Sequence, residues 1–355
     1  MTSEEKRVVG DVVGVTSYGF PIRPFTPKGK NRTVLICGRS VEALGRRVSD
    51  IIGLPLAPFT VKTFANGELL PQVQVSVRGK HVYLIQSVCP PDVNGYLMEL
   101  YLSICMLRRA SAKTVTAIIP HYGYARQDRK GTGHVPISAS DVAAMLVLGG
   151  VNRVISFDLH CSQIQGFFPA TVPCDNIPAA KIAVDYFAPL VEKQNQAGIS
   201  VAVVSPDAGG TARAKVFMDL LSRRLNCSIG FAMINKERKE AGKVSSMTLV
   251  GSVRNHVCII VDDMIDTAGT LVKAAETLQT QEGAVEVYAF STHGVFSGPA
   301  MNRITNSVLK EVVVCDTIPP PTELSPKIRY LSVDRLLASV ISSIVNCESV
   351  SALLE

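Results

Sequence analysis

The stretch that decides the fold runs from residue 257 to residue 270 and reads VCIIVDDMIDTAGT. An apolar run of strand length leads into two acids, a short loop of small residues follows, and a helix is expected from about Leu271. Ligands of open α/β sheets bind at the carboxyl ends of strands, and free N–H groups at a helix start favour a phosphate. The stretch therefore predicts an anion-binding loop at the end of a buried parallel strand.

The residues of this loop suit two tasks. Gly269 lets the backbone approach a phosphate closely, and the hydroxyl groups of Thr267 and Thr270 add donors. The two acids before the loop would repel phosphate, but carboxylates accept hydrogen bonds from neighbouring sugar hydroxyls. A plain helix cap at Asp266 or Thr267 is the alternative interpretation, and a cap does not require the acidic pair.

Similar strand-length runs occur on both sides of this stretch and alternate with helical stretches. The expected strands lie near residues 34–37, 82–85, 115–119, 154–157, 201–204, 257–261 and 285–288. The expected covering helices lie near residues 97–110, 139–148 and 271–279. Uninterrupted β-branched runs are typical of parallel strands that are covered on both faces, so the fold class is α/β.

A stretch with four prolines, 169–189, is the expected junction between two α/β halves. The expected division is an extension over 1–31, an N-terminal domain over 32–180 and a C-terminal domain over 181–338, with the tail 339–355 assigned to pack on the N-terminal domain.

Composition favours an ordinary intracellular enzyme. The chain has 355 residues, 47% of them hydrophobic, and a formal net charge of +6. That charge suits anionic small substrates but lacks the dense basic blocks of a nucleic-acid binder. Nine cysteines without a Cys-x-x-Cys pair indicate reduced thiols. There is neither an apolar signal core nor an apolar run of membrane-spanning length, so we expect a cytoplasmic protein with neither nucleic-acid nor membrane partners.

The 257–270 stretch resembles the phosphoribosyl diphosphate-binding motif of the type I phosphoribosyltransferase fold. Alone, it fits either a transferase that consumes phosphoribosyl diphosphate or a synthetase that makes it. Further segments resemble ribose-phosphate pyrophosphokinases. They are Phe64–Glu68, Gly123–Lys130, Asp158–His160 with Gln163–Phe168, Val204–Asp207 with Gly209-Gly210, Thr292-His293 with Ser297-Gly298, and Val314–Pro319. The resemblance runs from about Thr33 to the C-terminus and implies two tandem type I phosphoribosyltransferase-like domains.

The resemblance implies that ribose 5-phosphate and ATP are bound by different segments. The ribose 5-phosphate contacts would be Asp262, Asp263, Asp266, Thr267, Ala268, Gly269 and Thr270. The ATP contacts would be Phe64, Asn66, Gly67, Glu68, Arg126 and Gln127. A guanidinium can clamp phosphate or stack on a purine, and an amide can read a purine edge. Many members have aspartate where this chain has Asn66, which leaves the geometry of base recognition open.

Metal and catalytic positions follow from the same resemblance. His160 and Asp207 match metal-binding positions of the family, and Asp158 and Asp175 would contact the metal through water. The implied metal is Mg²⁺, which takes few protein ligands and keeps water molecules and substrate oxygens in its coordination shell. Pro169 stands where some members have a further acid. A lone histidine in such a position is more often structural.

The charged loop 234–242 is the segment that separates a synthetase from a transferase. Such loops are usually solvated turns, but this one resembles the mobile catalytic loop of the synthetases, with Lys236 and Arg238 as the two basic catalytic residues. Diphosphate transfer needs cations aimed at the transferring group, and a closing loop would exclude water.

The implied reaction transfers the β,γ-diphosphate of ATP to the anomeric hydroxyl of ribose 5-phosphate and releases AMP. The alternatives are a phosphoribosyltransferase, which would need no ATP loop, and a non-catalytic regulatory subunit, which would be expected to lose the basic loop or the metal residues. The family also implies a homo-oligomer, commonly a hexamer.

A second nucleotide site at a subunit interface is common in this family, with phosphate and ADP as effectors. The matching positions are Ser162, Gln165, Asp175, Asn176, Ser349 and Ser351. The loop after Lys130 is short and weakly basic, and Leu354 stands where an aromatic residue is frequent. We therefore expect phosphate to activate and ADP to inhibit chiefly by competition with ATP.

Overall fold

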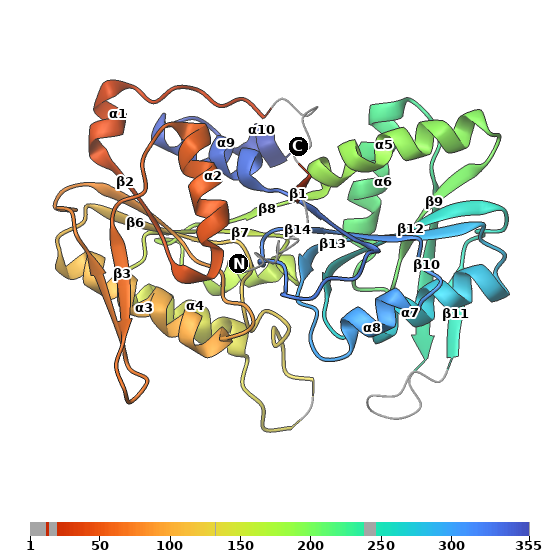
Figure 1. Cartoon of the computed structure of the whole chain (residues 1–355), viewed down its shortest axis with the longest axis horizontal. Helices are drawn as coiled ribbons and strands as arrows, with labels where there is room; N and C mark the ends of the chain where they lie inside the picture. The colour runs from red at the N-terminus through yellow and green to blue at the C-terminus, as the bar shows by residue number, and fades with distance from the viewer. Residues whose placement is uncertain (1–11, 14–19, 132, 238–245, 355) are drawn as a thin grey trace, which may run out of the picture. The chain divides into compact units, whose positions relative to one another are not determined.

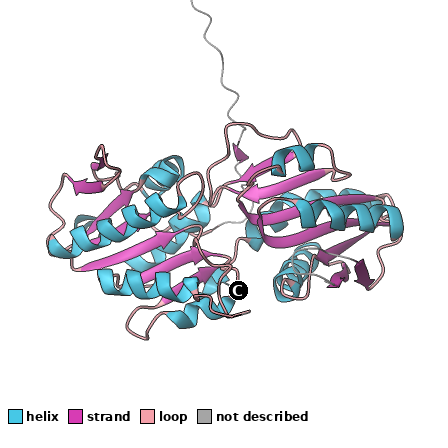
Figure 2. Ribbon diagram, turned by 90° about the horizontal axis from the view of Figure 1, so that it is seen from below, coloured by secondary structure: helices cyan, strands magenta, loops and turns pink. Residues whose placement is uncertain are grey.

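The computed structural model describes residues 12–13, 20–131, 133–237 and 246–354. The chain divides into two compact units. Unit 1 contains Val12–Val13, Ala180–Asp316 and Pro320–Ser332, and unit 2 contains residues 20–179, 317–319 and 333–354. In each unit, helices flank the strands of a sheet (Figure 2).

Unit 2 is built on a five-stranded parallel sheet in the order β2-β5-β6-β7-β8. Its strands are β2 (Thr33–Cys37), β5 (His81–Ile85), β6 (Thr114–Ile119), β7 (Arg153–Phe157) and β8 (Cys174–Ile177). A separate antiparallel hairpin pairs β3 (Phe59–Thr63) with β4 (Leu69–Val73). Four of these strands are the apolar runs that the sequence predicts, each extended by one residue at its start, and β8 is the fifth.

The helices of unit 2 cover both faces of this sheet, with α3 and α4 on one face and α2 and α9 on the other (Figure 1). They are α1 (Pro27–Arg32), α2 (Glu42–Ile52), α3 (Val93–Arg109), α4 (Ser138–Gly149), α9 (Asp334–Val345) and α10 (Ser351–Leu354), with the 3-10 turns η1 (Arg39–Val41) and η2 (Ser162–Phe167). Helix α3 begins where the Asp92 carboxylate accepts a hydrogen bond of 2.9 Å from the N–H of Gly95. Helix α4 ends where Gly150 adopts a left-handed φ of 93°, which glycine accommodates without strain.

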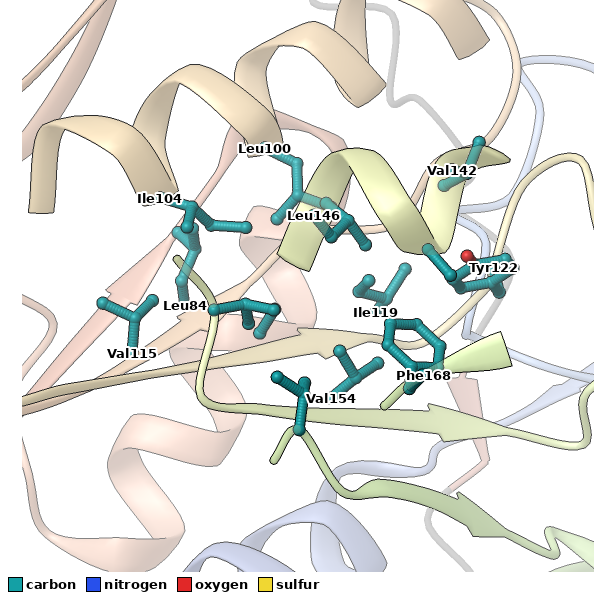
Figure 3. Close-up of a cluster of buried hydrophobic side chains, with 14 of the residues drawn as sticks. Leu84, Leu100, Ile104, Val115, Ile119, Tyr122, Val142, Leu146, Val154 and Phe168 are labelled. Carbon is teal, nitrogen blue, oxygen red and sulfur yellow. The ribbon is translucent and has the colours of Figure 1, made fainter. Parts of the chain in front are cut away.

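The core of unit 2 lies between its sheet and helices α3 and α4. Figure 3 shows side chains from both helices, such as Leu100 and Leu146, facing those of the strands, such as Leu84 and Val154. Leu100, Ile104 and Leu146 are completely buried. Each such side chain contributes about 1.5–3 kcal/mol by its removal from water, so this face alone fixes the packing of both helices.

Residues 20–32 pack against the C-terminal helix of unit 2. The hydroxyl of Ser342 on α9 donates to the carbonyl of Arg23 at 2.8 Å and accepts from its N–H at 3.2 Å. The hydroxyl of Ser339 donates to the carbonyl of Pro21 at 2.8 Å, and the Arg23 guanidinium pairs with Glu348 at 2.6 Å. The described part of the N-terminal segment is thus joined to α9 by backbone-directed hydrogen bonds.

Unit 1 is built on an eight-stranded sheet in the order β1-β15-β14-β13-β12-β9-β10-β11. The strands are β1 (Val12–Val13), β9 (Ser200–Ser205), β10 (Gly230–Glu237), β11 (Ser246–Val250), β12 (His256–Ile265), β13 (Glu286–Gly294), β14 (Glu311–Cys315) and β15 (Ile328–Leu331). All neighbours are parallel except the β10–β11 hairpin at one edge.

Helices again cover both faces of the unit 1 sheet (Figure 1). They are α5 (Ala180–Gln196), α6 (Thr211–Leu225), α7 (Gly269–Glu276), which continues into the π-helical turn η3 (Thr277–Gln281), and α8 (Ala300–Thr305). The face of α7 and α8 is held by a buried cluster that includes Leu271, Ala275 and Ile304. On the other face, the Phe187 ring of α5 packs edge-on against Phe217 of α6, with ring centroids 6.0 Å apart.

The predicted α/β fold class, with mainly parallel sheets flanked by helices, is confirmed in both units. The expected junction at 169–189 contains strand β8 and the first part of α5, with short turns before and after β8. Among the described residues, no helix is both long enough and apolar enough to cross a membrane.

Candidate active site

The acidic pair lies at the carboxyl end of β12, within the strand. Parallel pairing places Asp262 beside Ser291 of β13 and extends the strand to Ile265. The Asp263 side chain is buried and that of Asp262 is about one-third exposed, at 4% and 32% of their full areas. The N–H of Asp263 donates to the Oδ1 atom of Asp262 at 2.9 Å, which fixes the Asp262 carboxyl.

Arg213 on the first turn of α6 is the cation that faces this pair. Its Nη1 atom lies 3.4 Å from Oδ1 of Asp263 and 3.9 Å from Oδ1 of Asp262. Burial and the charge of Asp263 raise the pKa of Asp262 to about 8, while Arg213 opposes the rise. A carboxyl pair that shares one cation therefore retains a proton near neutral pH, as two closely spaced acids generally do.

The loop after β12 leads directly into α7. The hydroxyl-bearing residues Thr267 and Thr270 are exposed, so their hydroxyl groups are accessible to a ligand. Helix α7 starts at Gly269, two residues before the predicted start. The residue with left-handed backbone is Ala268, with φ of 58°, a conformation that costs alanine some strain.

The segment that follows β13 braces this loop. The N–H groups of Val295 and Phe296 both donate to the carbonyl of Ile265 at 3.0 Å. The N–H of Ser297 donates to the carbonyl of Asp266 at 3.1 Å. Arg303 of α8 donates from Nη1 to the carbonyl of Thr267 at 2.9 Å.

Asp207 follows β9 and caps helix α6. Its Oδ1 atom accepts a hydrogen bond of 3.0 Å from the N–H of Gly210, the N-cap residue. Its charge also contributes to the raised pKa of Asp262, which indicates that the two acids belong to one negative region of unit 1. The sheet order brings them together because β9 and β12 are neighbours.

The basic loop is only partly within the described residues. Lys236 lies near the end of β10, paired in register with Met247 of β11. Arg238 lies outside the described residues. The described strands do establish that the segment 238–245 connects the two strands of an edge hairpin.

The first of the predicted ATP segments forms the tip of the β3–β4 hairpin in unit 2. The Phe64 side chain is exposed, and the Lys62 ammonium lies 5.0 Å from the centre of its ring. The Asn66 Oδ1 atom accepts a hydrogen bond of 3.2 Å from the N–H of Glu68, and Gly67 adopts a φ of 89°. The Asn66 side-chain carbonyl thus holds this turn.

The second ATP segment is a turn after β6. Arg126 and Gln127 are both exposed, and the N–H of Gln127 donates to the carbonyl of Tyr124 at 3.1 Å. The Ser138 hydroxyl at the start of α4 donates to the side-chain carbonyl of Gln127. The Gln127 amide is thereby oriented with its NH₂ group away from α4.

The predicted metal residues are divided between the two units, with Asp207 in unit 1 and Asp158, His160 and Asp175 in unit 2. His160 is exposed after β7, whereas the Oδ2 atom of Asp158 accepts from the N–H of Ala179 at 2.8 Å. Asp175 pairs with Arg153 at the first residue of β7, near the amino end of that strand. Across the part of the chain that the structure describes, no group of three or more His, Cys, Asp or Glu side chains is suitably placed to hold a metal ion.

The expected effector positions form two local turns in unit 2. Ser162 and Gln165 share η2, where the Gln165 NH₂ group donates to the Ser162 carbonyl at 3.0 Å. Ser349 accepts from the N–H of Ser351 at 3.1 Å at the start of α10. The side-chain carbonyl of Asn176, in β8, accepts from the N–H of Leu159 at 2.9 Å.

The structure thus brings together the acid pair, the loop Asp266–Thr270 and Asp207 within unit 1, and both segments predicted to bind ATP belong to unit 2. Sequence reasoning missed Arg213 and Arg303. Neither arginine belongs to a recognisable motif, and only the strand order and the helix packing show which groups each one contacts.

The site thus joins strand-end acids to a loop at a helix start, in a protein with two α/β units. A family model described as the N-terminal domain of ribose phosphate pyrophosphokinase matches residues 33–150. A model of the phosphoribosyl synthetase-associated domain matches residues 232–355. Residues 20–32, which pack on α9, precede both matches.

Individual relatives agree with these matches. The chain is 43% identical to a ribose-phosphate pyrophosphokinase of Fusobacterium nucleatum, over 91% of this chain and 98% of the relative. It is 42% identical to ribose-phosphate pyrophosphokinase A of Dictyostelium discoideum, over 91% and 98% of the two chains. A crystal structure of phosphoribosylpyrophosphate synthetase from Mycobacterium smegmatis superposes with a TM-score of 0.80 at 37% identity, covering 89% of this chain and 99% of that one. The chain belongs to the ribose-phosphate pyrophosphokinase family.

Proposed function

We propose that this protein transfers the β,γ-diphosphate of ATP to the anomeric hydroxyl of ribose 5-phosphate, giving 5-phosphoribosyl 1-diphosphate and AMP for nucleotide biosynthesis. The observation that carries the proposal is the strand-end acid pair followed by the loop Asp266–Thr270 at the start of α7. Carboxylates accept hydrogen bonds from sugar hydroxyls, and the helix start favours the 5-phosphate.

The ribose 5-phosphate site proposed here lies in the C-terminal domain expected over 181–338. Asp262 and Asp263 would accept hydrogen bonds from the ribose hydroxyls, and Thr267 and Thr270 would donate to the 5-phosphate. The exposed hydroxyl groups of both threonines support this role. Arg213 would limit the mutual repulsion of the acids and so keep one carboxylate available as an acceptor.

ATP would bind to the N-terminal domain, expected over 32–180 with the tail 339–355. Phe64 offers an exposed aromatic face, and Asn66, Gly67 and Glu68 form the turn beside it. Arg126 would clamp phosphate oxygens or stack on the base, and the outward NH₂ group of Gln127 would donate to a purine nitrogen.

Mg²⁺ is the metal that polyphosphate chemistry of this kind uses, and it prefers oxygen ligands. The donor set fits that preference in part, since Asp207 supplies a carboxylate whereas His160 supplies an imidazole. Asp207 and His160 are proposed as ligands of the ion, which would also bind the substrate oxygens. Asp158 and Asp175 stay proposed as acids that act through water, although both already accept bonds from the protein.

Lys236 and Arg238 are proposed to stabilise the transferring group. Lys236 lies near the end of β10, which pairs with β11 at one edge of the sheet, and Arg238 follows two positions later in the sequence. Cations on such a loop would neutralise charge that develops in the transition state, and closure of the loop would exclude water. Retention of these residues and of Asp207 argues against a non-catalytic regulatory subunit, and the two ATP segments argue against a phosphoribosyltransferase.

Self-association into a homohexamer and a cytoplasmic location are proposed from the family. Phosphate is proposed as an activator at the polar positions around Ser162 and Ser349, with ADP acting chiefly as a competitor of ATP. Measurement of ADP inhibition at saturating ATP tests this point. Inhibition that persists there would show a separate nucleotide site and contradict the competitive scheme.

The reaction itself is tested by incubation with ATP, ribose 5-phosphate and Mg²⁺, followed by separation of the nucleotides. We expect AMP in amounts equal to the sugar diphosphate, because attack at the β-phosphorus expels AMP. Stoichiometric ADP would show an ordinary kinase, and no turnover with intact binding of both substrates would favour the regulatory subunit.

A further inference from the structure

Arg303 lies against the loop that precedes α7. Helices α7 and α8 lie side by side on one face of the unit 1 sheet (Figure 1). The Arg303 Nη1 atom donates to the carbonyl of Thr267 at 2.9 Å. The start of this loop is held in place, because the backbone N–H of the buried Phe296 donates to the carbonyl of Ile265 at 3.0 Å.

The guanidinium also occupies the space beside Gly269. A Cβ atom at Gly269 would lie 3.1 Å from Nη1 of Arg303, tighter than an ordinary contact. The glycine conformation is not left-handed, since only Ala268 in this loop has a positive φ, of 58°. A glycine at position 269 therefore leaves room for the Arg303 guanidinium, and its φ angle does not require glycine.

The bond to Thr267 sets the direction of a backbone donor. In a planar trans peptide the C=O and the following N–H point in opposite directions. Because the Thr267 carbonyl points to Arg303, the Ala268 N–H points away from Arg303. Alanine at the N-cap supplies no side-chain oxygen to the first N–H groups of α7, so this cap leaves them to an external anion.

We propose that Arg303 is a positioning residue for the 5-phosphate of ribose 5-phosphate, which it serves by orienting the Thr267–Ala268 peptide and by placing a permanent positive charge beside the loop. This inference rests on the proposed function. One guanidinium N–H is used by the carbonyl, and a guanidinium has five, so the charge and further donors remain beside the helix start.

The test compares Arg303→Met, Arg303→Lys and a control variant, Lys310→Met. Lys310 is an exposed cation of the same unit that pairs with Glu286 at 3.2 Å. It directly precedes β14, so it lies at the amino ends of the parallel strands, whereas the loop lies at their carboxyl ends. The control therefore removes the same charge far from the loop.

Arg303→Met should raise the KM for ribose 5-phosphate by about tenfold, the scale of one charge-assisted contact at an exposed site, and leave the KM for ATP unchanged. Arg303→Lys should recover part of that loss, and Lys310→Met should change the KM less than about twofold. An unchanged KM in Arg303→Met, or an equal rise for both substrates together with a lower melting temperature, would overturn the proposal.

A pH profile separates this role from a merely structural one. The second ionisation of a sugar phosphate lies near a pKa of about 6, so wild-type affinity should rise as the pH passes upward through that value. Arg303→Met should show a shallower rise, because a lost cation weakens the preference for the dianion. A profile parallel to that of the wild type would contradict the charge role.

Calorimetric binding of ribose 5-phosphate without ATP keeps the two proposals distinguishable. If the wild-type protein binds the sugar phosphate and Arg303→Met binds it about tenfold more weakly, the inference stands even where no AMP is formed. Equal binding by both proteins overturns the inference and leaves the proposed reaction intact.

Discussion

Replacement of Arg213 by methionine should weaken the ribose 5-phosphate site through the acid pair. Its Nη1 atom lies 3.4 Å from Asp263 and 3.9 Å from Asp262. At an effective dielectric constant of about 20, each contact is worth roughly 4–5 kcal/mol before desolvation. Solvent access to Asp262 and the cost of desolvation reduce the net effect to about 1.4–2.7 kcal/mol, which corresponds to a loss of affinity of about 10- to 100-fold.

The pH dependence of this loss has a defined sign. Burial and Asp263 already raise the pKa of Asp262 to about 8, so the carboxyl that should accept a ribose hydroxyl proton is largely protonated below that pH. Affinity of the wild-type protein for ribose 5-phosphate should therefore rise as the pH increases toward 8. Loss of Arg213, which lowers this pKa, should move the rise to a more alkaline pH.

The assay is the KM for ribose 5-phosphate between pH 6.5 and 9.5, with Arg223→Met as the matched control. Arg223 is exposed in the last turn of the same helix and donates to the carbonyl of Asp219 at 3.3 Å. A KM in Arg213→Met that equals the control value at every pH would refute the argument. A shift of the rise toward acid pH would refute the assigned sign.

Three further outcomes are expected. Asp262→Asn should weaken ribose 5-phosphate binding but raise the apparent melting temperature. The gain should grow up to about pH 8, because ionisation of a carboxyl whose pKa is raised in the folded state costs stability as the pH rises. A melting temperature below that of the wild type at pH 9 would contradict this. Ser342→Ala should lower the free energy of unfolding by about 1–3 kcal/mol, because the backbone N–H and carbonyl of Arg23 lose their hydrogen-bond partner. Arg23→Met should lower it by less than about 1 kcal/mol, because it removes only a surface ion pair. Equal effects of the two variants in urea denaturation would argue against the attachment of this segment to α9. Lys236→Ala and Arg238→Ala should each reduce turnover by roughly 100-fold at unchanged ribose 5-phosphate affinity, and a change confined to KM would exclude a transition-state role.

Local features of the site could be predicted from the sequence because they depend on near neighbours in the chain. The apolar run before Asp262 predicts β12, and small residues after it predict the loop before α7. The helix starts at Gly269 instead of Leu271, because Ala268 adopts the left-handed conformation that ends the loop. The sequence predicts that Gly269 lets the backbone approach a phosphate closely, and the structure shows that the Arg303 guanidinium also lies against this glycine.

Longer-range features could not be predicted in this way. In the sheet, β9 pairs with β10, which follows it in the chain, and also with β12, which comes two strands after β10. That order brings α6, and with it Arg213, to the acid pair. Likewise, nothing near Arg23 in the sequence indicates a partner more than three hundred residues away on α9.

The central claim, attack by the anomeric oxygen on the β-phosphorus of ATP, is tested most directly by isotope tracing. Ribose 5-phosphate labelled with ¹⁸O at the anomeric hydroxyl is incubated with ATP, Mg²⁺ and the protein, and the products are examined by ³¹P NMR and mass spectrometry. We expect ¹⁸O in the bridge between the sugar and the diphosphate, with unlabelled AMP in equal amount. Label in the released nucleotide would contradict attack at the β-phosphorus.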